Sequence, residues 1–390
     1  MLWTLDPRKL LSNRLPQVAS NPAFRLPDRV EVDYNWGSTR KKAALHPPKK
    51  TVDFGPDGLL VPTPGRVVTI SDVAAEAQVA RSTVSRALNH PGRLNLHTQQ
   101  HIQTIADRLG YHPNPVAKAL GTQRTQTLAL LLPNLSNQLF FGVIRGAEEQ
   151  AAAAGYALVL ADSKSDPDQE ASRINRLTGA VDGFILVAAR SPQGELQRLA
   201  STHRIAVVNR QVLGVSSVVV DPVMGATHAV EHLASLGHRQ VLYLGAAPRQ
   251  NWMNVRRWKS IRARGAALGV ETRQVGPFAP SQFGGAAAAD AAVADGATAV
   301  IAFNDLMAIG VIRRLTERGV AVPAEVSVVG FDDVFGSDFC SPSLTTLASP
   351  PEEIGRAAVR LLLEPAGAKA HSIVLPTHLV IRSSTGPAPG

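Results

Sequence analysis

The chain has 390 residues, of which 45% are hydrophobic, so it is long enough for two or three domains with real cores. Its single cysteine, Cys340, excludes an intrachain disulfide and a zinc site built from cysteines. The apolar runs are far shorter than the roughly 20 residues that a membrane helix needs, and the N-terminus lacks the order of a signal peptide. We therefore expect a cytoplasmic protein that has no membrane partner.

The net charge of +9 is unevenly distributed along the chain. Residues 1–65 hold ten Lys and Arg against six Asp and Glu, and residues 66–125 hold seven against three. The remaining 265 residues are almost neutral, with twenty-three against twenty-two. Because attraction to phosphate groups is electrostatic and local, a basic first third is typical of a nucleic-acid-binding head on a neutral core. Charge alone supports an ordinary solvated surface equally well.

Residues 1–65 contain many prolines and the basic cluster Arg40–Lys42, without sustained helical or strand periodicity. This composition predicts a disordered extension. An inert extension, or a start site assigned too early, is favoured over a basic arm that contacts DNA.

A small helical head is predicted for residues 66–112. Apolar residues recur at helical spacing in two groups that only a few residues separate: Ile70, Val73, Ala74 and Ala77, then Val79, Val84 and Leu88. This spacing indicates two short helices joined by a tight turn, with Thr69 or Ser71 as the cap of the first. A third helix is expected from about Thr98 to Leu109, ended by Gly110.

The first two helices have the pattern of a helix-turn-helix. In that motif the second helix lies in the major groove, so it needs polar side chains early and on one side. The predicted DNA contacts of the head are Thr69, Arg81, Ser82, Thr83, Ser85, Arg86 and Asn89. Either arginine could pair with a guanine, and the hydroxyl side chains could contact bases or phosphates. The alternative is an exposed helix with ordinary polar residues.

A second DNA-contacting element is predicted in residues 113–125, a hinge helix with its linker. Asn114 can cap a short helix that also carries Lys118 and ends near Leu120. So short a helix is stable only against partners, and a leucine wedged between base steps would kink the duplex and open the minor groove. An ordinary linker helix is the alternative, although it would have no reason to place an apolar leucine there.

Residues 126–385 are predicted to form an α/β core. Short Val, Ile and Leu runs at 127–132, 157–161, 183–187, 205–208, 240–245, 299–303 and 326–329 alternate with helical segments at 140–155, 169–178, 225–237, 305–318 and 354–364. This alternation favours parallel sheets in two lobes. Ligands of such sheets bind at the carboxyl ends of strands, where Asn209-Arg210, Asn304-Asp305 and Asp332-Asp333 fall.

Seven short motifs of the core, together with the head and the hinge, match a known family in their order and spacing. They are Pro133–Phe141, Val181–Gly183, Glu231–Leu233, Leu236–His238, Asn304-Asp305, Val328–Asp333 and Leu344–Thr346. Residues 67–385 resemble the lactose-repressor/galactose-repressor (LacI/GalR) family of bacterial transcriptional regulators.

The resemblance implies an all-α head and a hinge helix joined to a two-lobed core like that of periplasmic sugar-binding proteins, which forms a homodimer and closes on a small effector. It assigns Leu120 to the minor groove and Ser85 and Arg86 to the recognition helix. The effector-binding positions it implies are Phe140, Phe141, Arg257, Asn304 and Asp332. Arginine and aspartate suit vicinal hydroxyls, and a Phe face can stack on a ring. Alternatively, Asp332 only caps a helix and Phe141 is only core.

The sequence departs from the family pattern at five positions. Gln78 stands where the turn usually has Gly, which predicts a strained residue there. Ala80 replaces the hydroxyl residue that caps the recognition helix, a loss of about 1 kcal/mol of capping energy. Gln138 replaces a proline, Met253 a more polar pocket residue and Ser260 a glycine. These changes leave the class of effector open.

The predicted function is that of a sequence-specific DNA-binding transcriptional regulator, a repressor whose operator affinity is controlled by a sugar-like or nucleoside-like effector. Its expected partners are double-stranded operator DNA, the effector and a second copy of the chain, with no cofactor and no metal. A transport receptor is disfavoured by the head. An enzyme is disfavoured because phosphate-loop, nucleophile-elbow and His-Glu-x-x-His motifs are missing. Inducer versus corepressor and dimer versus tetramer stay open.

Overall fold

The computed structural model describes residues 68–89, 92–112, 124–247, 251–365 and 367–390. The predicted extension 1–65 and most of the predicted hinge, including Asn114, Lys118 and Leu120, lie outside these residues. The head and the core are described separately below.

The head consists of three helices, α1 (Ile70–Glu76), α2 (Arg81–Asn89) and α3 (Leu96–Leu109). Thr69 is the N-cap of α1, and its backbone N–H donates to the Asp72 carboxylate at 2.8 Å. The Asn95 side chain caps α3, which begins two residues before the predicted Thr98, and Gly110 ends it in the left-handed conformation at φ 66°. The helices enclose a small apolar core of Val73, Ala74, Ala77, Val84, Ala87, Ile102, Ile105, Ala106 and Leu109.

The turn between α1 and α2 contains the strained residue that the sequence predicts. Gln78 has a φ of 57°, a region that costs free energy for a residue with a side chain. Ala80 contributes only its carbonyl to the start of α2, accepting from the Thr83 and Val84 amides at 2.8 and 3.2 Å. The helix-turn-helix therefore forms without the usual glycine.

The core contains two six-stranded sheets. The first sheet has the order β11 (Ser372–Leu375), β5 (Ser217–Val220), β4 (Ile205–Val208), β3 (Gly183–Val187), β1 (Thr127–Leu132) and β2 (Ala157–Asp162), and all its pairs are parallel. The second has the order β12 (His378–Val380), β10 (Thr345–Ala348), β9 (Ser327–Asp332), β8 (Ala299–Ala302), β6 (Gln240–Ala246) and β7 (Glu271–Phe278), parallel except for β10 with β12. The predicted α/β core with parallel sheets in two lobes is confirmed.

Helices cover both faces of each sheet, so every central strand is buried on both sides. The first lobe carries α5 (Leu139–Ala153), α6 (Pro167–Leu177), α7 (Gln193–Thr202) and α12 (Pro351–Leu363). The second lobe carries α8 (Pro222–Ser235), α9 (Trp252–Leu268), α10 (Gln282–Asp295) and α11 (Asp305–Glu317).

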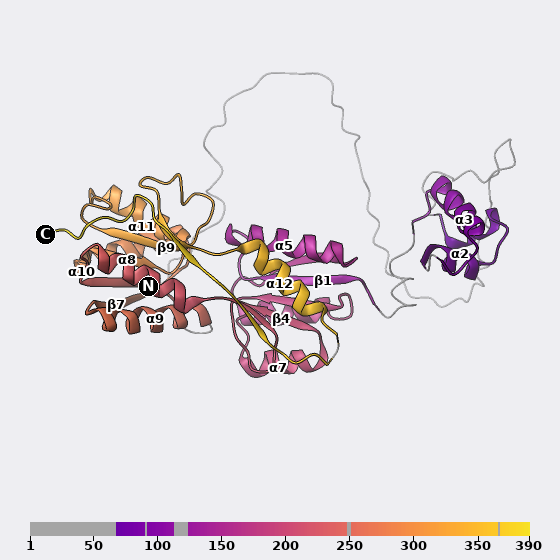
Figure 1. Cartoon of the computed structure of the whole chain (residues 1–390), viewed down its shortest axis with the longest axis horizontal. Helices are drawn as coiled ribbons and strands as arrows, with labels where there is room; N and C mark the ends of the chain where they lie inside the picture. Colours follow the sequence, from indigo (N-terminus) through magenta and orange to yellow (C-terminus); the bar gives the residue numbers. More distant parts are fainter. Residues whose placement is uncertain (1–67, 90–91, 113–123, 248–250, 366) are drawn as a thin grey trace, which may run out of the picture. The chain divides into compact units, whose positions relative to one another are not determined.

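The lobes are not consecutive in sequence. Within the described core the chain passes from one lobe to the other between β5 and α8, between β10 and α12, and between β11 and β12. Figure 1 shows the late helix α12 beside the early helix α5, far apart in the sequence. Three connections therefore join the two lobes within the described core.

Among the elements that the sequence did not predict are α9, α10 and β7, whose buried faces are not continuous apolar stripes. Residues of α9 that face the interior include Asn254 and Arg257, and the interior face of α10 is built from Gly and Ala. The edge strand β7 is mostly exposed. Hydrophobic periodicity cannot reveal such elements, since their burial depends on polar partners and close packing.

The close contact of α5 with α12 yields a prediction of stability. A Cβ at Gly146 would lie 1.9 Å from the carbonyl oxygen of Glu352, and one at Gly355 would lie 2.1 Å from that of Val143. Because backbone atoms cannot move aside as a side chain can, Gly146→Ala is expected to lower the free energy of unfolding by about 1–3 kcal/mol. Chemical denaturation of the full chain measures this change.

Gly194→Ala is the matched control, because a Cβ at Gly194 in α7 meets no atom within 4 Å. We expect it to keep or slightly raise the stability, since alanine is the better helix former. Equal stability of the Gly146→Ala and wild-type chains would show that the two helices pack less tightly than described.

Candidate functional site

A cavity of about 100 Å³ lies at the carboxyl ends of strands from both sheets. The first lobe contributes Asn134, Asn137, Phe140, Ser165, Ala188, Arg190 and Asn209 to its lining, and the second contributes Asn251, Met253, Arg257, Pro280, Phe303, Asn304 and Asp332. A neighbouring cavity of about 300 Å³ shares Ser165, Arg190, Asn251 and Pro280 with it. Together they have room for a small metabolite.

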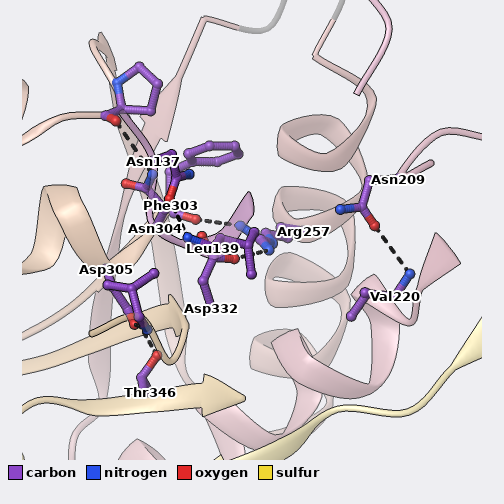
Figure 2. A network of polar contacts seen from close by, with 12 residues as sticks. Asn137, Leu139, Asn209, Val220, Arg257, Phe303, Asn304, Asp305, Asp332 and Thr346 are labelled. Carbon is purple, nitrogen blue, oxygen red and sulfur yellow. Dashed lines mark hydrogen bonds and ion pairs between the residues drawn. The ribbon is translucent and has the colours of Figure 1, made fainter. Parts of the chain in front are cut away.

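Arg257 is held at the centre of the site. It comes from α9, is only 7% exposed, and its guanidinium lies 4.0 Å from the ring centre of Phe331 and 5.1 Å from that of Phe303. It donates to the carbonyl oxygen of Phe303 and pairs with the Asp332 carboxylate at 3.6 Å (Figure 2). Its Nε has no hydrogen-bond partner in the described residues. The aromatic rings and the ion pair fix the guanidinium group.

Asp332 is the acidic group of the cavity and ends β9 with a φ of 118°. Burial raises its pKa to about 7, Arg257 opposes this rise, and the charge of Asp305 adds to it. The pKa of this carboxyl group therefore lies near neutral pH. A ligand that donates hydrogen bonds to the group would favour its ionised form.

Asp305 supports the site through three hydrogen bonds within the second lobe. This fully buried carboxylate accepts from the Thr346 hydroxyl at 2.6 Å (Figure 2). It also accepts from the Ser337 hydroxyl at 2.8 Å and the Val334 amide at 3.0 Å. Burial raises its pKa although these three donors oppose the rise. The sequence placed Asp305 at a strand end and could not reveal that it ties β10 to the loop after β9.

Asn304 lies in the lining and also caps α11. Its Oδ1 accepts from the Met307 amide at 3.0 Å, and its Nδ2 donates to the carbonyl oxygen of Pro280 at 3.4 Å. No helix of the described chain begins directly after Asp332, so capping is the role of Asn304 rather than of Asp332.

The structure separates the two predicted phenylalanines. Phe140 is 6% exposed and lines the cavity, whereas Phe141 is 57% exposed and is not part of the lining. The two are consecutive on α5, so they point in directions about 100° apart. Of the predicted effector residues, the cavity thus brings together Phe140, Arg257, Asn304 and Asp332.

The lining also contains Arg190, which the sequence did not mark, and Asn209, which the sequence placed at a strand end. Arg190 follows β3 and borders both cavities, and no motif marked it. Asn209 follows β4, where strand ends were expected to gather, and its Oδ1 accepts from the Val220 amide at 3.3 Å. Met253 also lines the cavity, whereas the Ser260 hydroxyl donates back to the carbonyl oxygen of Arg256 within α9.

The residues of the head that are predicted to contact DNA lie on α2 and at the N-cap of α1. On α2, Arg81, Ser82 and Arg86 are exposed, and Thr83 and Ser85 are half-buried. Val84 and Ala87 on the same helix are buried in the head core. Thr69 is exposed at the start of α1. The side chain of Asn89 and the hinge residues Asn114, Lys118 and Leu120 lie outside the description.

Within the described ranges, none of the helices combines the length and apolar character needed to cross a bilayer. No group of three or more His, Cys, Asp or Glu residues is placed there to hold a metal ion.

Comparisons with known proteins agree with this architecture. The model of the lacI family of bacterial regulatory proteins matches residues 69–114, and that of the periplasmic binding protein-like domain matches residues 230–385. The HTH-type transcriptional regulator DegA of Bacillus subtilis (strain 168) is 32% identical over 334 residues, covering 82% of this chain and 98% of that protein. The HTH-type transcriptional repressor CytR of Escherichia coli (strain K12) is 28% identical over 331 residues, covering 82% and 97%.

Solved structures give the same result. The lac repressor dimer bound to operator and an anti-inducer is similar with a TM-score of 0.72 and 25% identity, covering 82% of this chain and 100% of that one. The transcriptional regulator CelR in complex with cellobiose has a TM-score of 0.61 and 28% identity, covering 81% and 99%. With its helix-turn-helix head, its two-lobed core and relatives matched over almost their whole length, the chain belongs to the lacI family of bacterial regulatory proteins.

Proposed function

We propose that the chain is a homodimeric transcriptional repressor whose affinity for operator DNA is set by a small effector bound between the two lobes. The observation that carries this proposal is the cavity at the strand ends of both sheets, centred on the Arg257–Asp332 pair, in a chain that also has a helix-turn-helix head. We also propose that the protein acts in the cytoplasm, because that is where operator DNA would be bound. The relatives named above are regulators, which supports a binding role over catalysis.

The chemistry of the cavity suits a hydroxylated ring. The Arg257 guanidinium and the Asp332 carboxylate offer a donor and an acceptor side by side, and Phe140 offers an apolar face. In the relative CelR the bound molecule is cellobiose, a sugar. We propose that the effector contacts Phe140, Arg257, Asn304 and Asp332. Phe141 would contact it only if closure of the two lobes moved this side chain toward the cavity.

Exposed apolar residues on the second lobe support self-association. Phe283 on α10 is 87% exposed, and Phe335 and Phe339 are 76% and 64% exposed with their ring centres 4.9 Å apart. Aromatic side chains this exposed are typical of protein interfaces. The lac repressor structure is a dimer on its operator. We propose that two copies associate through this lobe and present two heads to the two halves of one operator.

Selection of random duplex DNA by the purified full chain, at stated salt, tests the function. Sequencing of the bound pool is expected to give a near-palindromic motif with a flexible central step, because two heads read two half-sites and Leu120 of each hinge enters the minor groove. No enriched motif, either alone or with a metabolite pool that supplies a corepressor, would contradict the proposal.

Arg86 is predicted to read a base from α2. Arg86→Ala is expected to weaken binding to the selected duplex by about 1–3 kcal/mol and to relax specificity at one position of each half-site. Fluorescence anisotropy on duplexes with single changes measures both effects. Arg108→Ala is the matched control, since Arg108 lies on α3 and pairs with Glu76 rather than projecting from α2. A uniform loss on all duplexes would make Arg86 a phosphate contact instead.

Effector affinity is predicted to depend on pH through Asp332. Its pKa is raised to about 7 in the free protein, and hydroxyl donors of a ligand favour the ionised form, so binding releases a proton below pH 7. Affinity should be full above pH 7 and fall as pH decreases through 7, by up to about tenfold per unit. Calorimetry in two buffers of different ionisation enthalpy measures the proton release. Asp332→Asn should abolish this release; its persistence would assign it to another group.

A further inference from the structure

Five asparagines line the smaller of the two cavities, and each turns its side-chain oxygen toward the backbone. The amide of an asparagine has one acceptor atom, Oδ1, and one donor group, Nδ2. In all five the Oδ1 atom accepts from a backbone N–H, at 2.8 Å for Asn134, 3.1 Å for Asn137, 3.3 Å for Asn209, 3.2 Å for Asn251 and 3.0 Å for Asn304. Figure 2 shows this bond for Asn209. Because a backbone N–H can only donate, the oxygen must face it, and Nδ2 lies on the other side of each amide.

The donor groups of these amides are mostly unused. Nδ2 of Asn304 donates to the carbonyl oxygen of Pro280 at 3.4 Å, whereas Nδ2 of the other four makes no hydrogen bond within the described residues. Asn251 is only 6% exposed and borders both cavities. A buried donor that lacks an acceptor is costly, so a ligand that supplies the acceptor gains affinity.

Asparagine is concentrated at the cavity rather than at capping positions in general. Away from the cavity, in the described core, aspartates accept from a backbone amide two or three residues further on, at 2.7, 2.8 and 2.8 Å for Asp162, Asp166 and Asp221. None of these three lines either cavity. Aspartate caps as well as asparagine does, and its charge is favourable at a helix N-terminus. Capping therefore explains the oxygen atoms, but it does not explain five amides around one cavity.

The side chains of the smaller cavity offer few acceptors. The Asp332 carboxylate is shared with Arg257, and the Ser165 hydroxyl donates its proton to the carbonyl oxygen of Pro133 at 3.2 Å, which leaves its lone pairs for a ligand. A sugar hydroxyl that accepts from an amide must also place its own proton, and a desolvated proton without an acceptor costs affinity. Oxo groups and ring nitrogens only accept, so they match a wall of amide donors better.

We propose that the effector is an oxo-type nucleoside, a heterocycle with oxo groups joined to a hydroxylated ring, and that the asparagine amides donate to its oxo groups. This inference rests on the proposed function, because it concerns the ligand of the same site. The hydroxyls meet Arg257 and Asp332, and the flat heterocycle lies among Phe140 and Phe303 of the lining. An amino group in place of an oxo group is rejected, because its protons would face the Nδ2 protons.

The test compares two matched pairs of probes on the full chain, inosine with adenosine and uridine with cytidine. In each pair an oxo group of the first member stands where the second carries an amino group, and ribose is the parent without a heterocycle. Affinities come from calorimetry and from the shift of the melting temperature with ligand concentration. In at least one pair we expect the oxo member to bind about tenfold or more tightly than both its amino partner and ribose.

Asn137→Asp and Asn209→Asp assign this preference to the amides. Aspartate keeps an oxygen for the backbone N–H of Leu139 or Val220, so the loop is retained, and it replaces Nδ2 by an atom that only accepts. At least one of the two variants should abolish or reverse the preference. Asn95→Asp is the matched control, since Asn95 caps α3 in the head with the same kind of bond, and it should leave the preference unchanged. The melting temperature without ligand verifies that each variant folds.

The inference is overturned if neither pair shows an oxo preference, or if the preference survives in both aspartate variants. Failure of every nucleoside to bind overturns it as well. Binding of the selected operator duplex, measured on the same preparation, separates these results from a failure of the proposed function. A chain that binds its operator but has no oxo preference refutes the inference alone.

Discussion

The Arg257–Asp332 pair is the constraint on which the arrangement of the second lobe depends. It joins the middle of α9 to the end of β9, and the carbonyl oxygen that Arg257 also reaches lies at the end of β8. A buried ion pair stabilises a fold best when the remaining donors and acceptors are satisfied, and here one donor, the Arg257 Nε, has no hydrogen-bond partner in the described residues. Here two aromatic rings flank the cation, and the braced carboxylate of Asp305 lies close enough to raise the pKa of Asp332. A ligand that binds here would therefore change the balance of charge among Arg257, Asp332 and Asp305.

The position of that pair explains how one ligand can influence the whole core. The cavity takes residues from loops after β1, β3 and β4 in the first lobe and from α9 and the ends of β8 and β9 in the second. Closure on a ligand would be transmitted by three chain connections, between β5 and α8, β10 and α12, and β11 and β12. A ligand shifts such an equilibrium only by its differential affinity for the two states.

Much of the fold could be predicted from the sequence, because the inner strands are continuous apolar runs and most helices have an apolar stripe. β3 and β4 begin and end where the sequence predicts, and the strained turn at Gln78 was also foreseen. α9 was not, since its interior face includes Asn254 and Arg257, whose partners come from distant strands.

The candidate site was predicted in part from strand ends, which gave Asn209, Asn304 and Asp332, and in part from the family resemblance, which added Phe140 and Arg257. Arg257, Asn304 and Asp332 fall at positions that the family pattern marks. Phe140 and Phe141 could not be separated, because one residue of helix phase decides which of them faces the cavity. Arg190 follows a strand with no motif around it, and the backbone of its loop is held by Glu170 and Arg210, which are 20 residues away on either side. Such charge clusters are visible only in three dimensions.

The central claim is that the cavity and the head are coupled. The most direct test is the affinity of the full chain for its selected duplex, measured with and without a saturating cavity ligand. Coupling of this kind predicts a change of roughly 5- to 150-fold, in either direction, that disappears when Asp332 is replaced by Asn. The same operator affinity at saturating ligand would contradict the account, because a ligand that binds without changing DNA affinity cannot regulate it.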